Sequence, residues 1–381
     1  MPTFTTSGGQ EFTFGSPAAI HNSMCRRLDA MAVLKDSLWL KFFPTENAVD
    51  PMGNPAVEIR YRFRNMYCGL QSWRGAGNQF PVVNYDRSMR ECVLKPGYWG
   101  EKTLLKEEQL MRMVGTPGAC NMPYSLNQYI GEDQEYLLIR QLSRQNLLAV
   151  QTMVFGKYFA MDSMTGQTVL EEQFNIIRTA PAVRWSDLNN STPFRDLLNW
   201  KLQYQQQTLA NWGRCAKLVV NPNTYAWLIQ NSNTANWSLL GQGYCCYQKT
   251  LEEINQRLYD MDLPQIYVDT ARYVECKDNA ALLPGQLPIS QRYFLPDGYA
   301  VLVGCTDMPT FEHEGSTFPV VGNLWLTKNL TGDCSLQGYN GLFSQVKPYC
   351  ERDVTELENK MGWNGAFALE CPQSIISLWV G

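Results

Sequence analysis

Residues able to do acid–base chemistry are few in this sequence, and their spacing is poor. The 381-residue chain has two histidines, His21 and His313, although histidine is the side chain that enzymes use most for proton transfer near neutral pH. His313 lies between Glu312 and Glu314. Three consecutive side chains do not converge on one metal ion in a helix or a strand. We therefore expect an exposed polar loop there, and no metal site.

The twelve cysteines do not form a catalytic or metal-binding pattern. The sequence has no C-x-x-C pair, and the adjacent Cys245 and Cys246 have a spacing that suits neither a zinc site nor a redox loop. A nucleophilic cysteine would need His21 or His313 beside it, and no cysteine has the local setting of a known cysteine enzyme. We interpret the thiols as reduced and buried. A cytoplasmic thiol hydrolase that uses a cysteine with His313 stays open as an alternative function.

Glycine-rich and acidic motifs are equally weak. The stretch "GQGYCCYQ" lacks the third glycine of a dinucleotide-binding fingerprint, and the sequence has no G-x-x-x-x-G-K-[ST] phosphate loop. The stretch "GCTDMPTFEHEGS" does not have the spacing of a calcium-binding loop. We predict no catalytic residue, no cofactor and no metal.

The bulk composition is that of a globular protein without a strong electrostatic attraction to nucleic acid. Hydrophobic residues make up 45% of the chain, which is enough for a real core in two or three compact units. The 32 Lys and Arg residues against 36 Asp and Glu give a net charge of −4, which does not favour tight phosphate binding. The sequence shows neither a signal-peptide pattern nor a run of about 18 apolar residues. We therefore expect synthesis in a cytoplasm and no membrane partner.

Residues 57–94 carry the pattern of an extended β-hairpin. Apolar side chains alternate with Arg60, Arg62 and Arg64 in its first half, as in a half-buried strand. A glycine-rich tip that carries Trp73 follows, and then a second alternating run. A two-stranded hairpin is marginally stable by itself in water. We therefore expect it to lie on other parts of an assembly, with Trp73 packed on another subunit.

Residues 132–157 have the periodicity of a long helix. Glu132 and the acidic residues after it suit a helix N-terminus, and Gly156 with Lys157 indicates the end. Wound as a helix, the segment has a broad apolar stripe and a second, narrow one on a different face. The narrow stripe consists of Leu137, Leu148 and Phe155. Two apolar faces need two separate partners.

The remaining segments indicate an arm followed by mixed α and β structure. Residues 1–20 are rich in Gly, Ser and Thr and are typical of an arm that becomes ordered only on a neighbour, with a helix beginning near Pro17. Residues 94–113 indicate a loop with a short helix, and 167–179 a strand pair. Further along we expect helices over 192–213 (with Thr192 as N-cap and Gly213 at the end), 222–231 and 250–261, strands over 216–221 and 264–275, a hairpin turning at Asp297 and Gly298, and a last strand over 367–381.

The order of these segments resembles that of the lambda-type major capsid proteins of tailed phages, whose subunits have the Hong Kong ninety-seven capsid fold. The stretch "YLLIRQLSRQNLLAVQTMVFGKY" is similar to the family's long spine helix with its Gly-Lys end. The stretch "FNIIRTAPAVRWSDLNNSTPFRDLLNW" looks like the family's strand, Trp-Asp step and proline-started helix. The similarity covers the architecture of most of residues 20–381 through apolar patterns with few fixed letters. It continues in "VVNPNTYAWLIQN", "TLEEINQRLYDMDLPQIYVDTARYV" and "LPDGYAVLVG".

The resemblance implies an α+β fold of five parts. These are an N-terminal arm and short helix over 1–40, an extended loop formed by a β-hairpin over 41–105, a peripheral domain over 106–182 with the spine helix at 132–157, an axial domain over 183–304, and C-terminal strands of the peripheral domain over 305–381. The broad stripe of the helix would pack on the long sheet of the peripheral domain. The narrow stripe would face the extended loop of a neighbouring subunit.

The implied function is self-assembly. A major capsid protein forms hexamers and pentamers of an icosahedral virion shell around double-stranded DNA, which it contacts weakly and without sequence specificity, and a cement or scaffold protein can be a further partner. The nearest alternative is an encapsulin, a cellular compartment shell with the same fold. The residues expected at subunit interfaces are Arg60, Arg62, Arg64, Trp73, Arg74, Leu137, Leu148 and Phe155.

The lysine distribution adds one expectation about how such a shell would be stabilised. Some relatives link subunits by a lysine–asparagine isopeptide bond at the hairpin tip. No lysine lies between Lys41 and Lys95 in this chain. We therefore expect non-covalent stabilisation.

Overall fold

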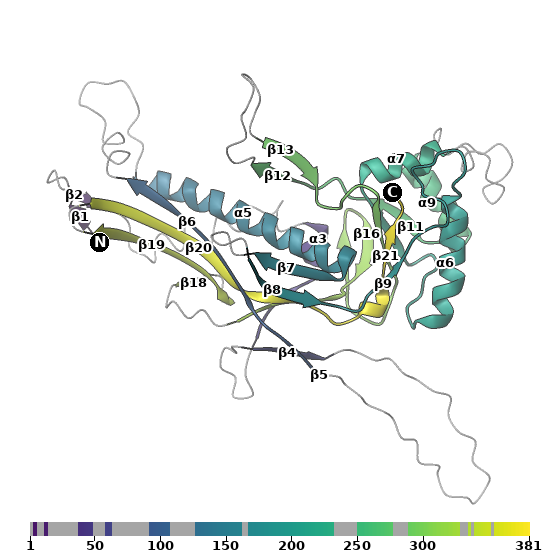
Figure 1. The fold of residues 1–381 in the computed structure, drawn as a ribbon, viewed down its shortest axis with the longest axis horizontal. Helices are drawn as coiled ribbons and strands as arrows, with labels where there is room; N and C mark the ends of the chain where they lie inside the picture. The colour runs from purple at the N-terminus through teal and green to yellow at the C-terminus, as the bar shows by residue number, and fades with distance from the viewer. Residues whose placement is uncertain are drawn as a thin grey trace, which may run out of the picture.

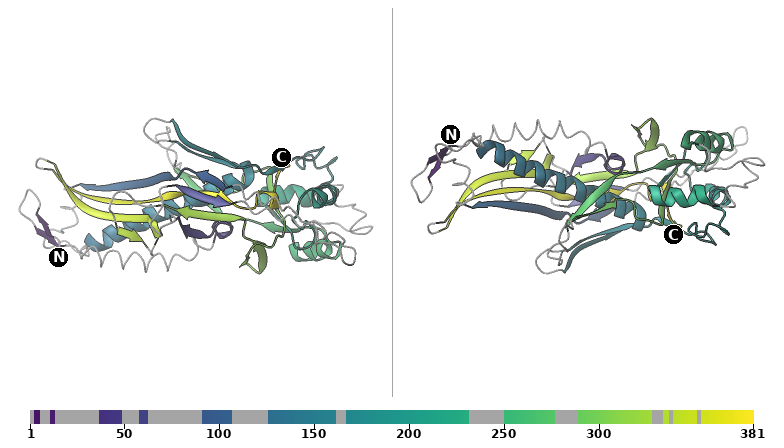
Figure 2. Two further views of the ribbon diagram at one scale, coloured as in Figure 1. Left: turned by 90° about the horizontal axis from the view of Figure 1, so that it is seen from below. Right: turned by 90° about the horizontal axis from the view of Figure 1, so that it is seen from above.

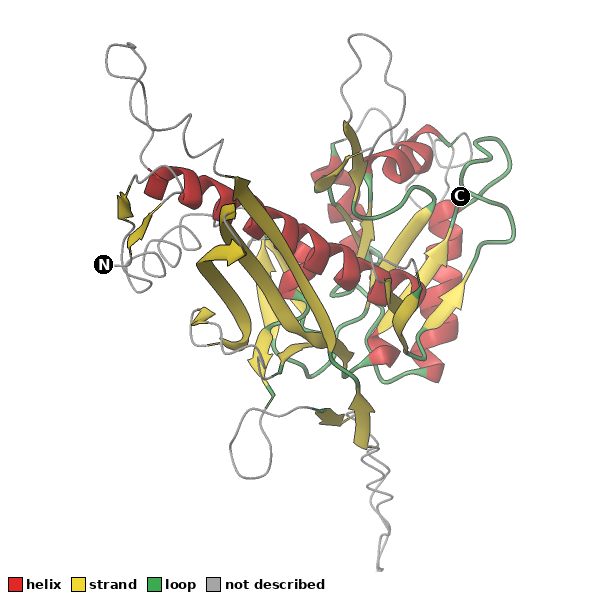
Figure 3. Ribbon diagram, turned by 60° about the vertical axis from the view of Figure 1, so that its left-hand side comes forward, coloured by secondary structure: helices red, strands yellow, loops and turns green. Residues whose placement is uncertain are grey.

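The structure is a computed structural model with a mixed α+β fold (Figure 1). A long sheet with one long helix forms one half, and a smaller sheet with a group of helices forms the other (Figures 1 and 3). The mixed α+β class expected from the sequence is therefore confirmed. The residues described are 3–5, 11–13, 37–48, 58–62, 91–106, 126–161, 167–231, 250–276, 289–327, 334–336, 339–351 and 354–381.

The long sheet has six strands and is organised around one central strand. Its members are β6 (Gly97–Lys106), β20 (Val354–Leu369), β19 (Tyr339–Glu351), β18 (Cys334–Leu336), β17 (Gly322–Leu326) and β3 (Thr45–Asn47). The central β20 pairs with β6 along one edge, and with β19 and then β17 along the other. One strand therefore ties together segments from both ends of the sequence.

β6 corrects the prediction of a loop and a short helix over 94–113. Its ten residues pair antiparallel with β20, from Gly97 opposite Gly365 to Lys106 opposite Glu356. Residues 107–125 lie outside the described part of the chain. The local sequence gives little indication of this strand because its partner lies near the other end of the chain, and tertiary pairing overrides local propensity.

The predicted long helix is α5, which spans Leu126–Phe155 and lies along one face of the long sheet (Figures 1 and 2). It begins earlier than predicted, so Glu132 lies beyond its first turn, because Gly131 is buried in the helix and does not end it. The predicted end is confirmed. Gly156 has a φ of +59°, and a Cβ there would lie 2.7 Å from Ile176 Cγ1, so this position needs glycine.

The strand pair predicted over 167–179 is wrong in its pairing. β8 (Thr168–Gln173) pairs with β7 (Lys157–Met161), which follows directly from the helix. β9 (Ile177–Thr179) instead pairs in parallel with β21 (Ile375–Trp379). The two predicted strands exist, but the bend after Gln173 sends them into different sheets.

The second sheet has five strands and joins the two halves of the fold. Its order is β11 (Gln265–Val268), β10 (Lys217–Val220), β14 (Tyr299–Val303), β21 and β9. One face, with Leu218 and Leu302, packs with α6 (Pro193–Gln207), α7 (Pro222–Gln230) and α9 (Leu251–Asp260). The other face, with Val219 and Val301, belongs to the same core cluster as α5. The alternation of side chains along each strand thus divides two hydrophobic cores. The sheet includes β9 and β21, which both lie outside 183–304, and the predicted domain boundaries stay predictions.

Local signals in this half are confirmed unevenly. The helix predicted from Thr250 has a full capping box with Glu253, and Asn221 caps α7 by accepting from Thr224 N at 2.7 Å. Thr192 occupies the N-cap position of α6 without a side-chain cap bond, and that helix ends at Gln207 instead of Gly213.

Three predicted strands divide or pair differently from the prediction. Residues 264–275 form β11 and then β12 (Arg272–Cys276), which are separated at Asp269 and pair in different sheets. The turn at Gly298 has the expected positive φ of +78°, but β13 (Ile289–Tyr293) before it pairs with β12, and β14 after it pairs with β10 and β21. Residues 367–381 contain the end of β20, a 3-10 turn η3 (Pro372–Ser374) and β21.

The N-terminal segments are described only in part. β1 (Thr3–Thr5) pairs with β2 (Glu11–Thr13), and α3 (Leu38–Lys41) is a short helix whose Leu38 and Trp39 are buried. Most of the helix predicted from Pro17 lies outside the described residues. Within the described part of the chain, no helix is both long and apolar enough to cross a membrane.

Candidate assembly surfaces

The base of the predicted hairpin is formed by β4 (Ile59–Arg62) and β5 (Glu91–Leu94). Ile59 and Leu94 face each other and are buried in the core shared with α5, while Arg60 and its cross-strand partner Val93 are exposed. The predicted alternation is therefore confirmed here. The side chain of Arg62 and all of Arg64, Trp73 and Arg74 lie outside the described residues, so their roles at an interface stay predictions.

The narrow stripe of α5 is covered by this chain itself. Leu148 is buried in the main core, Leu137 packs with Met361 of β20, and the Phe155 ring lies edge-on to Tyr299 at 5.2 Å between centroids. The expected contact of these side chains with a neighbour's loop stays a prediction, although the single chain already buries Leu137 and Leu148 and half-buries Phe155. The reason for this burial is that α3, β7 and the five-stranded sheet all contact α5 in addition to the long sheet.

The exposed side of α5 carries polar and aromatic side chains that are joined to β6 by an ion pair. Arg140 binds the carboxylate of Glu101 through two nitrogens, with Nη2 2.8 Å from Oε1, and its guanidinium lies 5.5 Å from the Tyr136 ring centroid. The hydrogen bonds from Arg140 hold the pKa of Glu101 below its usual value. Ile139 and Tyr136 beside this pair are exposed.

The two faces of β6 differ in what covers them. Trp99 stacks on Trp363 at 5.5 Å, and Thr103 Oγ1 donates to Asp133 Oδ2 of α5 at 2.7 Å, so the odd-numbered side chains face the helix. The even-numbered side chains point away from α5, where Tyr98 is 62% exposed and Leu104 is 42% exposed. We name this second side, with Tyr98, Lys102 and Leu104, the open sheet face. Sequence analysis missed it because the segment was predicted as a loop, and its apolar residues lie in adjacent pairs, at 98–99 and 104–105, instead of alternating.

A second group of exposed apolar side chains lies on the half that contains the five-stranded sheet. Leu202 on α6 and Leu209 just after it are both more than half exposed. Trp379 at the end of β21 is also exposed and is covered on one side by Arg184, whose Cζ is 3.7 Å from the ring centroid. Such exposed aromatic and aliphatic side chains are candidate contact points for another subunit.

His313 is placed differently from the sequence-based expectation. It ends β15 (Thr310–His313), which pairs with β16 (Ser316–Pro319), and it is 9% exposed instead of lying in an open loop. Its Nδ1 is 3.3 Å from Lys41 Nζ, and its ring lies 5.9 Å from that of Tyr267. The hairpin folds back because Glu314 and Gly315 take positive φ angles, and this carries the histidine onto Tyr267.

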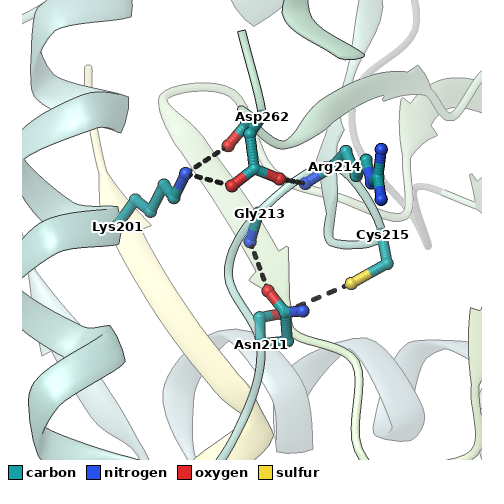
Figure 4. Close-up of polar contacts among 6 residues, drawn as sticks. All are labelled: Lys201, Asn211, Gly213, Arg214, Cys215 and Asp262. Atoms are coloured by element: carbon teal, nitrogen blue, oxygen red, sulfur yellow. Dashed lines mark hydrogen bonds and ion pairs between the residues drawn. The ribbon is translucent and has the colours of Figure 1, made fainter. Parts of the chain in front are cut away.

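The described cysteines and acidic residues form no metal-ligand group. Within the described ranges, no cluster of three or more His, Cys, Asp or Glu side chains could hold a metal ion. Cys371 is buried as expected, whereas Cys92, Cys215 and Cys305 are half-buried, which corrects the expectation for those three. Cys215 lies in the loop between α6 and β10, beside a network of Lys201, Asp262 and Arg214 (Figure 4).

Comparison with known proteins gives matches to solved structures alone. No protein-family model matches the chain, and no curated protein matches it in sequence. Similar solved structures include the putative capsid protein of a prophage of E. coli CFT073 (TM-score 0.45, 12% identity, 91% of this chain and 93% of that chain). They also include the capsid of Myoviridae phage XM1 (TM-score 0.41, 8% identity, 90% of each chain) and a virus-like particle from Pyrococcus furiosus (TM-score 0.40, 13% identity, 93% and 97%).

Proposed function

We propose that this chain is the major capsid protein of a tailed bacteriophage and builds the icosahedral shell of the virion from hexamers and pentamers of itself. The proposal starts from the resemblance in the order of segments. It is supported by a long helix that ends at Gly156 and lies on a long sheet, by a hairpin base at β4 and β5, and by a five-stranded sheet with a group of helices on one face. In this proposal they would serve as the spine helix, extended loop, peripheral domain and axial domain of the Hong Kong ninety-seven capsid fold.

The observation that carries the proposal is the open sheet face. In a single folded chain, α5 covers one side of β6, and Tyr98 and Leu104 stay exposed on the other. Val93 at the hairpin base is also 54% exposed. Burying this apolar surface between subunits would contribute favourable free energy at about 25 cal/mol per Å² of apolar area. Many modest contacts of this kind suit a closed shell, because each interface can still open and correct an error during assembly.

The chemistry of the chain is consistent with a structural protein that encloses DNA. A net charge of −4 gives an inner wall that can contain DNA without binding it tightly. A cement or scaffold protein remains a proposed further partner, and synthesis in the host cytoplasm remains part of the proposal.

Native mass measurement and negative-stain microscopy of the purified full chain test the proposal. We expect closed particles of megadalton mass. A chain that stays monomeric or dimeric at high concentration would overturn the proposal and favour the thiol hydrolase. Closed particles that enclose protein cargo instead of DNA when isolated from their native source would favour the encapsulin alternative.

Leu104 and Leu105 give a matched pair of variants that separates assembly from folding. Leu104 is on the open sheet face, whereas Leu105 is 3% exposed on the helix side. Leu104→Asp should leave the circular dichroism spectrum unchanged and abolish particles, because a carboxylate would be buried at the interface without a partner. Leu105→Asp should prevent folding. Normal particles from Leu104→Asp would remove the open sheet face as an assembly surface.

A further inference from the structure

Two thiols from distant parts of the sequence meet beside the loop between α6 and β10. Cys215 and Cys305 are separated by 90 positions, and the Cys305 sulfur lies 2.9 Å from the carbonyl oxygen of Cys215. Both residues are half-buried, so neither is enclosed in the core. This proximity is independent of the assembly surfaces described above.

The loop that carries Cys215 is held by an acidic anchor (Figure 4). Lys201 Nζ donates to the main-chain oxygen and to Oδ2 of Asp262, each at 2.6 Å, and Asp262 Oδ1 accepts from Arg214 N at 3.0 Å. Gly213 makes room for this carboxylate, since a Cβ there would lie 2.4 Å from Asp262 Oδ1. Arg214, the residue before Cys215, is therefore held in place through its main-chain N–H.

The segment that carries Cys305 is joined to the same loop. Asn211 and Cys305 exchange both main-chain hydrogen bonds, at 2.8 and 3.0 Å, in an isolated bridge. Asn211 Oδ1 also accepts from Gly213 N at 2.9 Å. The two cysteines are thus held by one hydrogen-bonded unit.

The electrostatic surroundings make one of the two thiols the nucleophile. A hydrogen bond from the Cys305 thiol lowers the pKa of Cys215 to about 7; burial and the Asp262 charge oppose this shift, and the Arg214 charge assists it. The same contact, together with burial, raises the pKa of Cys305, so Cys305 keeps its proton while Cys215 ionises. The Arg214 guanidinium is itself held over the Tyr259 ring, 5.4 Å from the centroid.

We propose that Cys215 and Cys305 form a reversible dithiol site that exchanges with small disulfides of the glutathione type. In the first step the Cys215 thiolate attacks one sulfur of the small disulfide, an S–S bond to Cys215 forms, and the old S–S bond breaks. The leaving thiolate takes up a proton. In the second step Cys305 gives up its proton and attacks the Cys215 sulfur, which forms the Cys215–Cys305 bond and releases the second small thiol. Two electrons pass from the protein to the small disulfide, and excess small thiol reverses both steps.

The expected rate advantage is moderate. At pH 7 a thiol with a pKa of about 7 is half ionised, against about 3% for an ordinary thiol with a pKa of about 8.5. A less basic thiolate is also a weaker nucleophile, which removes part of this gain. Cys215 should therefore react about threefold faster than an ordinary exposed thiol at pH 7.

The test treats the full chain with oxidised glutathione at pH 7, blocks remaining thiols by alkylation, and maps peptides by mass spectrometry without reduction. The wild-type protein should give a linked Cys215–Cys305 peptide that disappears on adding reduced glutathione. Cys305→Ser should instead accumulate glutathione on Cys215, because the resolving thiol is missing. Cys215→Ser should give neither product. Cys92→Ser is the matched control, since Cys92 is also half-buried but lies in β5, and it should leave the linked peptide unchanged.

Two results would overturn the proposal. One is a wild-type protein in which Cys215 is found alkylated, and so has not reacted with oxidised glutathione, while Cys92 carries glutathione. The other is a Cys305→Ser variant with an unchanged circular dichroism spectrum and no adduct on Cys215. If Cys305→Ser does not fold, the linked peptide in the wild type and its absence in Cys215→Ser decide the question.

Discussion

Replacing Trp39 with phenylalanine should weaken the contact between α3 and the turn that follows β11. Trp39 is fully buried, and its Nε1 donates to Asp269 Oδ2 at 2.6 Å. The other oxygen of that carboxylate accepts from Ala271 N at 3.1 Å. Asp269 is 5% exposed, so water cannot replace the lost donor. The substitution removes the donor and keeps most of the apolar volume.

The magnitude follows from these contacts. Removing a donor to a buried charged group costs about 1.5–3 kcal/mol, and losing part of the indole from a packed core costs about 1 kcal/mol more. We therefore expect Trp39→Phe to lower the free energy of unfolding at pH 7 by about 3 kcal/mol. This is a large share of the roughly 5–15 kcal/mol typical of a folded domain.

The loss should depend on pH in a defined direction. Burial raises the pKa of Asp269, and the Trp39 hydrogen bond opposes that rise. A carboxyl whose pKa is higher in the folded than in the unfolded state adds stability below the unfolded pKa of about 3.9, and this stability is lost as the pH rises through the folded pKa. Without Trp39 the folded pKa rises further. The difference between variant and wild type should therefore be largest near pH 7 and should narrow toward pH 4.

Urea unfolding of dilute, unassembled protein, followed by circular dichroism at pH 4, 5.5 and 7, measures this difference. Asp269→Asn and the double variant complete a cycle that isolates the contact. The double variant should lose less stability than the sum of the two single variants, by about 1.5–3 kcal/mol. A Trp39→Phe effect that is equal at all three pH values, or an additive cycle, would refute the reasoning.

Four other predictions concern backbone strain, protonation and assembly. Gly156→Ala should cost about 2 kcal/mol because of the positive φ and the contact with Ile176, and an unchanged thermal midpoint would contradict it. Burial raises the pKa of Asp196 to about 6, so the stability that the protonated carboxyl contributes is lost as the pH rises from about 4 to 6. Asp196→Asn should therefore raise the free energy of unfolding at pH 8 by about 1–2 kcal/mol after screening, and leave it unchanged at pH 4. The midpoints of urea unfolding at the two pH values would show this difference. Arg60→Glu should block particle formation seen by microscopy while circular dichroism stays unchanged, and normal particles would argue against a role for the hairpin base. Denaturing gels of mature particles should show single-chain bands, since no lysine lies over 42–94, and a covalent ladder would disprove non-covalent stabilisation.

Features set by neighbouring residues were predictable from the sequence. The capping box of Thr250 and Glu253 and the glycine that ends α5 involve groups within a few positions of each other, so their physical cause is visible in a short window. The alternation at the hairpin base is equally local. These signals placed element ends and exposed faces, but they did not determine which strands pair.

Pairing and coverage depend on segments that are distant in sequence. β6 is a strand because β20 provides a ten-residue partner, and β9 joins β21 instead of the adjacent β8. The Cys215–Cys305 site was invisible for the same reason, because only the bridge between Asn211 and Cys305 brings the two thiols together. No local window contains both halves of any of these contacts.

The cover over α5 places the surface for the proposed assembly elsewhere on the subunit. From the sequence, the uncovered surface was expected to be the narrow stripe of the helix, yet Leu148 is only 1% exposed. Among the described residues, the apolar surface that a single copy leaves exposed includes Tyr98 and Leu104 on β6 and Val93 on β5. A helix already packed on two sheets is held rigidly, because moving it would disturb the packing against both sheets at once. Subunits built in this way can fold first and associate afterwards through sheet and hairpin surfaces.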